Sequence, residues 1–352
     1  MTDCSQAIAA AIETASAQGQ ALFICGGGSK RQLLGRDCEA QLLDVSGHSG
    51  ITGYQPSELV LSARAGTPLV DLLAELEREN QTLPFEPPLF DGRATLGGTI
   101  ACNMSGPARP WAGSARDLVL GVQLIDGRGQ LLNFGGRVMK NVAGYDVSRL
   151  QVGALGTLGV LTEISLKVLP KPEHSMTLAY DMDASEAIQT MNRRAGQSGP
   201  LSGACWLEGR LYLRLSGAAA AVEHTGIAWG GETMRDTGFW RDLREMSLPF
   251  FSGTEPLWRM SIKSSAGVLD HPCPTLIDWG GAQRWLRGEF SLPELQRAAQ
   301  SAGGHATLFC GGDRNSEVRP TPAAVAQRLQ RRLKYAFDPQ GILNPGRLYG
   351  WL

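Results

Sequence analysis

Apolar side chains in the first part of the chain recur with the spacing of a helix in two places. Residues 5–18 carry alanine and isoleucine on one helical face, which predicts an amphipathic helix. A second helix is predicted to open at Thr67-Pro68, because threonine can cap a helix and proline suits its first position. Its apolar stripe consists of Leu69, Leu72, Leu73 and Leu76. We interpret that stripe as core packing without a role in chemistry.

Shorter apolar segments in the same part of the chain have the pattern of strands. Residues 21–24 and 59–65 are apolar runs of strand length. Residues 118–125 and 130–134 flank a turn rich in glycine and predict a hairpin. Residues 160–168 alternate, so that apolar side chains and a threonine share one face of a further strand.

After Glu173 the predicted strands and helices alternate at short intervals, which favours an antiparallel α+β arrangement. The predicted strands are residues 176–180, 204–207, 211–215, 258–262, 275–279 and 305–310. The predicted helices are residues 184–195, 218–228, 291–302, where Ser291 has capping-box spacing, and 321–337, which is basic and carries Val325, Leu329 and Leu333 on one side.

These patterns predict an α+β protein with two main parts, and 352 residues suffice for both parts to have a core. We expect a first domain over residues 1–170, made of subdomains over about 1–58 and 59–170. A smaller antiparallel α+β domain is expected over residues 171–320. A helix and tail over residues 321–352 are expected to pack back on the first domain.

Glycine gathers at three places in the first part, each beside a predicted strand. Residues 25–30 read Cys-Gly-Gly-Gly-Ser-Lys and can present backbone N–H groups and a cation to phosphates. This run does not match the dinucleotide fingerprint, because Arg31 stands where that motif has a glycine. It does not match the P-loop either, because Ser29 stands where that motif has a glycine. The others are residues 94–117, which hold no apolar run of ordinary element length, and 153–159. Each alone fits a turn or surface loop, but together they can wrap an extended phosphate-bearing cofactor.

Composition argues against several classes of function. Lys+Arg 33 and Asp+Glu 34 leave a net charge of -1 without a basic tract, which argues against nucleic-acid binding. The seven cysteines are scattered and never spaced as CxxC, which argues against a zinc, iron–sulfur or disulfide framework and for a reducing compartment. No signal-peptide pattern or apolar run of roughly 20 residues is present. We therefore expect a cytoplasmic protein, and docking onto a membrane-bound partner stays open.

The glycine-rich segments stand in the order found in FAD-linked oxidases of the vanillyl-alcohol oxidase type, and the chain resembles that family. The resemblance covers about residues 20–170 and the last dozen residues. Its motifs are Gly26-Gly-Gly-Ser-Lys30, Ala94-Thr-Leu-Gly-Gly-Thr99 with Asn103, Gly144-Tyr-Asp146, Gly156-Thr-Leu-Gly159 and Asp338-Pro-Gln-Gly-Ile-Leu-Asn-Pro345. Phe85-Glu-Pro-Pro88 and the short second domain look most like the FAD-binding subunit of glycolate oxidase, the smaller flavin subunit of a three-part complex.

The resemblance implies a PCMH-type domain of two α+β subdomains that clasp FAD, with a cap domain over the flavin ring. The residues that it assigns to FAD are Gly26, Gly27, Gly28, Ser29 and Lys30 in the first pyrophosphate loop, Leu96, Gly97, Gly98, Thr99, Asn103, Ser105, Gly106, Gly113, Ser114 and Asp117 along the pyrophosphate and ring, Gly153, Gly156, Thr157, Gly159 and Val160 on the ribityl and adenine side, and Asn344 near the flavin. No histidine lies in the first loop, so we expect non-covalent FAD, while a link through Cys25 or Cys102 stays open.

The chain departs from the larger flavin subunits of this class at positions that matter for mechanism. Ala154-Leu155 stand where those subunits typically carry Ser-Glu, and Gly304-His305 is the nearest remnant of their histidine-rich metal motif. Oxidation of a hydroxy acid needs a base for the hydroxyl proton and a cation or metal for the carboxylate. No constellation in the sequence supplies both, so we assign neither a catalytic base nor a metal site.

Three hypotheses follow. The first is an FAD-binding subunit of a glycolate (2-hydroxy acid) oxidase complex, whose partners are a larger FAD subunit and an iron–sulfur subunit that takes the electrons. Through such a complex the chain would associate peripherally with the inner face of the cytoplasmic membrane. The second hypothesis is a self-contained FAD-linked oxidase of a small 2-hydroxy acid. The third is an interaction subunit that keeps the fold and binds no flavin.

Overall fold

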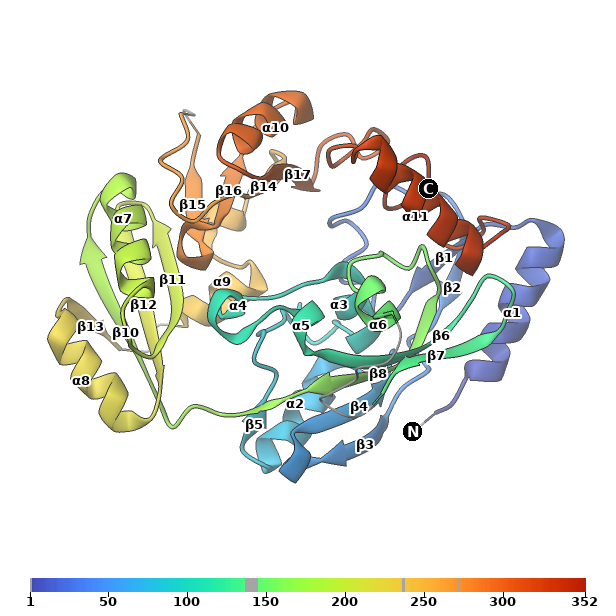
Figure 1. The fold of residues 1–352 in the computed structure, drawn as a ribbon, viewed down its shortest axis with the longest axis horizontal. Helices are drawn as coiled ribbons and strands as arrows, with labels where there is room; N and C mark the ends of the chain where they lie inside the picture. The colour runs from blue at the N-terminus through green and yellow to red at the C-terminus, as the bar shows by residue number, and fades with distance from the viewer. Residues whose placement is uncertain (1, 137–144, 236–237, 271–272) are drawn as a thin grey trace.

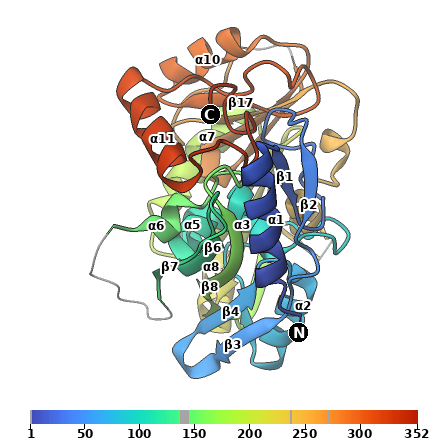
Figure 2. The same cartoon turned by 90° about the vertical axis from the view of Figure 1, so that its right-hand side faces the viewer.

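The computed structural model describes residues 2–136, 145–235, 238–270 and 273–352 (Figure 1). It is a mixed structure of helices and mainly antiparallel sheets, in which two β-rich parts lie side by side. The chain then returns to its first part, where α11 (Ala324–Phe337) and the C-terminus lie close to α1 (Ser5–Gln18) and β1 (Leu22–Cys25) (Figures 1 and 2). The helix predicted over residues 5–18 is confirmed.

Two sheets and a short strand pair form the first part. Strands β1 and β2 pair in parallel, whereas the larger sheet has the order β3-β4-β8-β6-β7 with antiparallel neighbours. The predicted hairpin is confirmed as β6 and β7. The bounds are β2 Gln41–Asp44, β3 Ile51–Gln55, β4 Val60–Arg64, β6 Val119–Ile125, β7 Leu131–Gly135 and β8 Val160–Lys167, and the short pair is β5 Gln81–Thr82 with β9 Leu169–Pro170.

Helix α2 (Leu69–Arg78) packs its leucines on the five-stranded sheet, as its stripe predicts. Leu69, Leu72 and Leu76 are fully buried. The predicted cap is wrong, because the helix begins after Pro68 without a side-chain cap. The Thr67 hydroxyl instead donates to the Arg64 carbonyl at 2.7 Å and accepts from the Gly50 amide at 2.9 Å, which holds the end of β4.

The glycine-rich segment 94–117 contains regular structure that apolar run lengths do not predict. Its three short helices are α3 Leu96–Cys102, α4 Arg109–Ala112 and α5 Ala115–Leu118. Two of them have caps: the Thr95 side chain caps α3, and Ser114 with Asp117 makes a capping box on α5. Gly97 lets α3 lie against β4, since a Cβ there would stand 2.7 Å from the Ala65 Cβ.

The second part is an eight-stranded sheet in the order β13-β10-β12-β11-β15-β16-β14-β17, with antiparallel pairs throughout. All six predicted strands are present, whereas β13 and β16 were not predicted. The sequence of β16, QRWLR, has too few apolar residues to show a strand pattern. The bounds are β10 His174–Asp181, β11 Leu201–Leu207, β12 Arg210–Gly217, β13 Glu232–Met234, β14 Leu257–Ser261, β15 Thr275–Asp278, β16 Gln283–Arg287 and β17 His305–Cys310.

Helices α7 (Ala184–Ala195), α8 (Ala219–Trp229) and α10 (Leu292–Ser301) cover one face of this sheet, whereas α9 (Phe239–Glu245) packs on the other face, which turns toward the first part of the chain. Met260 of β14 and Leu286 of β16 pack with α10, whereas their neighbours Arg259 and Trp285 point the opposite way because strand side chains alternate. On that opposite face, Met104 from the first part joins the same apolar cluster as Trp285. Of the helices of this part, α9 was not predicted.

The C-terminal helix α11 presents its predicted apolar side to solvent: Val325 and Leu329 are 60% and 54% exposed. It is anchored at its end by buried Lys334, whose Nζ donates to Asp338 Oδ2 at 2.7 Å. The same Nζ donates to the Thr157 carbonyl at 2.9 Å. This ion pair therefore fixes the turn that leads the tail back to the first part.

Two predictions remain open after this description. Residues 140–151 were predicted as a turn and a short helix; α6 (Val147–Leu150) agrees, and residues 140–144 lie outside the described part. The domain limits at residues 170 and 320 stay predictions. In the described residues, the helices are too short or too polar to span a bilayer.

Candidate functional site

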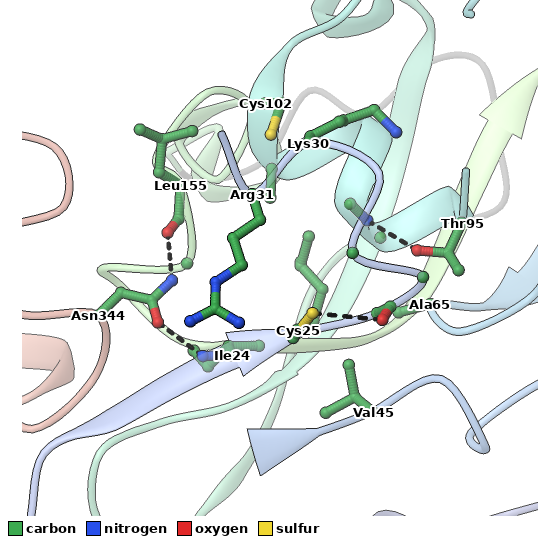
Figure 3. Close-up of a pocket in the computed structure, with 18 of the residues that line it drawn as sticks. Ile24, Cys25, Lys30, Arg31, Val45, Ala65, Thr95, Cys102, Leu155 and Asn344 are labelled. Carbon is green, nitrogen blue, oxygen red and sulfur yellow. Dashed lines mark hydrogen bonds between the residues drawn. The ribbon is translucent and has the colours of Figure 1, made fainter. Parts of the chain in front are cut away.

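A pocket of about 860 Å³ lies in the first part of the chain, where all three glycine-rich segments meet (Figure 3). It is bounded by the end of β1 and the loop after it, by α3, and by the loop before β8. The C-terminal tail reaches it through Asn344 and Arg347. Segments more than 300 residues apart in the sequence, such as β1 and the tail, therefore share one site.

The loop after β1 offers unused backbone donors to this pocket. Among the described residues, the amide N–H groups of Gly26, Gly27, Ser29 and Lys30 have no hydrogen-bond partner. A run of free N–H groups in a turn is a favourable site for phosphate oxygens. The N–H groups at the start of α3 differ, because the Leu96, Gly97 and Thr99 amides donate to backbone carbonyls.

Close packing explains why this loop carries consecutive glycines. A Cβ on Gly26 would stand 2.5 Å from the Thr95 Oγ1, and a Cβ on Gly27 would stand 1.8 Å from the Arg93 carbonyl oxygen. Gly28 has a φ of 68°, in the left-handed region. Any side chain at Gly27 would displace backbone, so the loop keeps its shape only with glycine there.

Among the residues that the structure describes, three cations and no carboxylate line the pocket. Lys30 is 6% exposed, lies over the Phe90 ring at 5.2 Å, and burial lowers the pKa of its ammonium group to about 8. Arg31 and Arg347 supply the other two positive charges. A buried cation without an acidic neighbour in the pocket favours an anionic ligand.

The tail and the third glycine segment are locked together by Asn344. Its Oδ1 accepts from the Ile24 amide at 2.7 Å, and its Nδ2 donates to the Leu155 carbonyl at 2.6 Å (Figure 3). A Cβ on Gly156 would stand 2.7 Å from that Nδ2, so the approach needs glycine. Gln151, 2% exposed, also lines the pocket, and its buried Nε2 has no partner among the described residues.

Two thiols line the pocket, and both are held in the neutral form. Burial raises the pKa of Cys25 and of Cys102, which outweighs the opposing effect of nearby cations. The Cys25 Sγ also donates to the Gly26 carbonyl at 3.4 Å. Because the thiolate is the nucleophile, both cysteines are poor candidates for a covalent bond to a ligand.

The structure brings nine of the residues predicted to hold a cofactor to the pocket wall: Gly26, Gly27, Gly28, Ser29, Lys30, Gly97, Gly98, Gly156 and Gly159, with Asn344 as a tenth. Ser105 and Gly106 line a second, smaller cavity instead. The remaining predicted residues lie off the pocket wall and are Leu96, Thr99, Asn103, Gly113, Ser114, Asp117, Gly153, Thr157 and Val160.

Five of the residues off the wall have structural roles in this fold. Leu96, Thr99 and Val160 are fully buried in the core. Ser114 and Asp117 bond to each other in the capping box of α5. They hold the shape of the segments whose neighbours line the pocket.

Several lining residues carried no signal in the sequence. Two of them have a signal that can be recognised once the structure is known: Thr95 is the cap of α3, and Arg347 is the cation that follows Asn344-Pro-Gly. Apolar wall residues such as Val45, Ala65 and Leu161 lie on β8 or directly after β2 and β4, where their side chains look like ordinary core residues. Only the fold shows which face of those strands meets the pocket.

Comparison with known proteins shows which family the chain resembles. Residues 3–135 match the family model described as "FAD binding domain". The glycolate oxidase subunit GlcE of Escherichia coli (strain K12) is 47% identical over 350 residues, which cover 99% of both chains. The glycolate oxidase subunit GlcD of Bacillus subtilis (strain 168) is 34% identical over 169 residues, or 47% of this chain and 36% of that relative.

The fold also has a solved counterpart. Alkyldihydroxyacetonephosphate synthase superposes with a TM-score of 0.65 at 14% identity, covering 96% of this chain and 75% of that one. At this identity the likeness concerns the fold alone. This likeness of fold covers nearly the whole chain, whereas the family model covers residues 3–135.

Proposed function

The chain belongs to the family of FAD-linked oxidoreductases that includes the glycolate oxidase subunit GlcE, and on this premise we propose that it is the FAD-binding subunit of a complex that oxidises glycolate to glyoxylate. The FAD-binding expectation of the sequence resemblance is confirmed at the level of family and fold. The residues that hold FAD, the partners and the route of the electrons are parts of the proposal.

The observation that supports the proposal most is the match between the pocket and an extended dinucleotide. The free amides of Gly26, Gly27, Ser29 and Lys30 would receive the pyrophosphate, and the three pocket cations would balance its charge. Asn344 would hold the wall made by the loop at Gly156. Bound FAD would supply the acceptor for a hydride, which carries both electrons, from the substrate carbon.

We propose that FAD is held without a covalent bond. The neutral thiols of Cys25 and Cys102 support this, since neither is a nucleophile in this state. The same groups are suited to packing against a ring or ribityl chain, since free cysteine behaves as a small apolar side chain.

The electrons are proposed to leave through partner subunits, one with a second flavin and one with iron–sulfur clusters. The names of the relatives support an assembly, because GlcE and GlcD are both subunits of a glycolate oxidase. The seven scattered cysteines of this chain offer no iron–sulfur pattern of their own. Peripheral attachment to the cytoplasmic membrane through that complex remains part of the same proposal.

The test is to purify the chain alone and with its co-expressed partners, and to measure flavin absorbance and glycolate-driven reduction of a dye. We expect FAD in both preparations, released intact by denaturation, and multiple turnovers only in the complex. Full turnover by the chain alone would establish a self-contained oxidase instead. A colourless chain that takes up no added FAD would contradict the proposal and support the flavin-free alternative.

A further inference from the structure

A second cavity of about 390 Å³ lies where the eight-stranded sheet faces the first part of the chain. One wall is the segment after α3, which includes Met104 and Ser105. The opposite wall is formed by Arg259 of β14, Asp278 of β15 and Trp285 of β16. FAD binding in the first pocket gives these residues no role.

The cavity adjoins the cofactor pocket at the end of α3. Cys102 lines the cofactor pocket, and Met104, two residues further along, lines the second cavity. Burial raises the pKa of the Cys102 thiol and the positive charge of Arg259 lowers it in part, so Arg259 lies near the cofactor pocket as well as in the second cavity. A molecule in the second cavity would therefore sit beside the cofactor and under the sheet.

Asp278 is a buried carboxylate without a structural partner at one oxygen. It is 3% exposed, and among the described residues its Oδ1 has no hydrogen-bond partner. Burial raises the pKa of Asp278 to about 7, although the Trp279 backbone N–H and the charge of Arg214 lower it. Arg214 also pairs with Glu86 at 2.9 Å, and that carboxylate raises the pKa of Asp278. A carboxylate that ionises near neutral pH in a cavity is suited to accept a proton.

Arg259 is a cation whose donors are free. Its guanidinium lies over the Phe309 ring at 5.4 Å and makes no hydrogen bond or ion pair with any residue that the structure describes. Burial and the like charge of Arg319 lower its pKa to about 10, so it stays charged. The other arginine on the cavity wall, Arg244, differs because Glu245 pairs with it at 2.7 Å. Arg259 is therefore available to a carboxylate ligand.

We propose that this cavity binds the 2-hydroxy acid, with the substrate carboxylate on Arg259 and its hydroxyl group toward Asp278, which takes the hydroxyl proton. This inference rests on the proposed function and adds that this subunit itself oxidises the substrate. The two residues lie on neighbouring parts of one sheet face, 19 positions apart in the sequence, which is why no local motif shows them.

In the proposed step, the bond between hydrogen and the substrate's second carbon breaks, and its electron pair leaves with the hydrogen as hydride to FAD, the oxidant. The O–H bond breaks, its electrons form the C=O bond of the 2-oxo acid, and the proton passes to the Asp278 carboxylate. Arg259 holds the substrate carboxylate throughout and keeps its own proton.

The size of the cavity points to a small acid. Less open space lies inside it than inside the cofactor pocket. Met104, Trp285 and Phe309 add large side chains to its wall. A two- or three-carbon hydroxy acid would fit the space better than one with a long side chain.

The first test measures ligand binding without turnover. Oxalate, a small carboxylate, is used as the probe in equilibrium dialysis and thermal-shift assays of the purified complex. We expect Arg259→Met to weaken oxalate binding roughly 10- to 100-fold, through loss of charge-assisted hydrogen bonds. Arg241→Met is the matched control, because this arginine on α9 has a side chain that is 66% exposed. It should leave oxalate binding unchanged.

The second test measures proton transfer. Asp278→Asn keeps the shape of the side chain but removes the base, so glycolate oxidation should fall roughly 10²- to 10⁴-fold while oxalate binding and FAD content persist. In the wild-type complex the rate should fall as the pH decreases through about 7, because protonated Asp278 accepts no proton. This limb of the pH profile should be missing in the variant.

Failure of this inference is distinct from failure of the proposed function. A complex that contains FAD in this chain and oxidises glycolate at the wild-type rate with Asp278→Asn would overturn the inference and leave the function standing. Unchanged oxalate binding in Arg259→Met would overturn it as well. Absence of FAD from the wild-type chain would contradict the proposed function itself.

Discussion

The two cavities of this chain are built in opposite ways. The cofactor pocket is made largely of backbone: consecutive glycines, free amide groups, and three cations on loops. The second cavity is made of side chains on one sheet face, with Arg259 and Asp278 held between strands. The first kind of site tolerates few changes of local conformation, whereas the second depends on a few isolated side chains. Mutations can separate the two.

The largest expected effect is at Gly27. Even alanine there would place a Cβ 1.8 Å from the Arg93 carbonyl oxygen, so the loop after β1 has to move. We expect Gly27→Ala to lose FAD, as measured by flavin absorbance of the purified chain. Gly98→Ala is the control, because its Cβ would meet only the Thr95 Oγ1, at 3.2 Å. Equal FAD content in the two variants would contradict the assignment of the loop.

The next largest effect is expected where the tail is anchored. Lys334→Met leaves the Asp338 carboxylate buried at 1% exposure without its ion pair. Loss of one partner from a buried pair costs about 3 to 5 kcal/mol, so chemical denaturation should show a large drop in stability. Arg328→Met, at an exposed position of the same helix, should change it by less than about 0.5 kcal/mol. Similar stabilities for the two variants would show that the pair does not anchor the tail.

The buried Asp278 of the second cavity should make the stability of the chain depend on pH. Burial raises the pKa of Asp278 from 3.8 to about 7, so the folded chain holds a proton that the unfolded chain releases, and stability is lost as the pH rises through this window. Asp278→Asn removes that dependence. The free energy of unfolding of this variant, relative to that of wild type, should therefore rise by about 3 kcal/mol from about pH 4.5 to about pH 7.5. A constant difference across this range in thermal unfolding would show that Asp278 titrates normally.

The smallest effect is expected at the thiols. Cys102→Ala should keep its FAD and lose about 1 kcal/mol or less of stability, since the neutral thiol acts only by packing. Acid precipitation should release the flavin from wild type and variant alike. Flavin that stays with the precipitated wild-type chain but not with the variant would prove a covalent link through Cys102.

The same contrast explains what the sequence could predict. Helices 5–18 and 184–195 and the strand 305–310 are predicted with correct bounds, because each has a clear period or cap. Glycine runs indicate the pocket that we propose for the cofactor, because free amides and close backbone contacts demand glycine in consecutive positions. These are local properties, and the amino-acid order carries them directly.

Other features depend on contacts that no local pattern records. The strand β16 was not predicted, since its polar residues Gln283 and Arg284 are buried only in the folded sheet. Arg259 and Asp278 looked like ordinary strand residues until the fold placed them on one wall. The partnerless state of Asp278 Oδ1 is visible only in three dimensions. Sites made of side chains on different strands are therefore found only from the structure, whereas sites made of glycine-rich backbone can be predicted from the sequence.

The central claim, that this chain holds FAD in its own glycine-lined pocket, is tested most directly by the flavin content of Gly98→Ala and Gly98→Asp. Both variants add a Cβ at one pocket-lining position, and only aspartate adds a negative charge beside the proposed pyrophosphate. An acidic residue in the first turn of α3 should not harm the helix. We predict wild-type FAD content with alanine and a flavin-free, folded chain with aspartate. Full FAD content in Gly98→Asp would contradict the account.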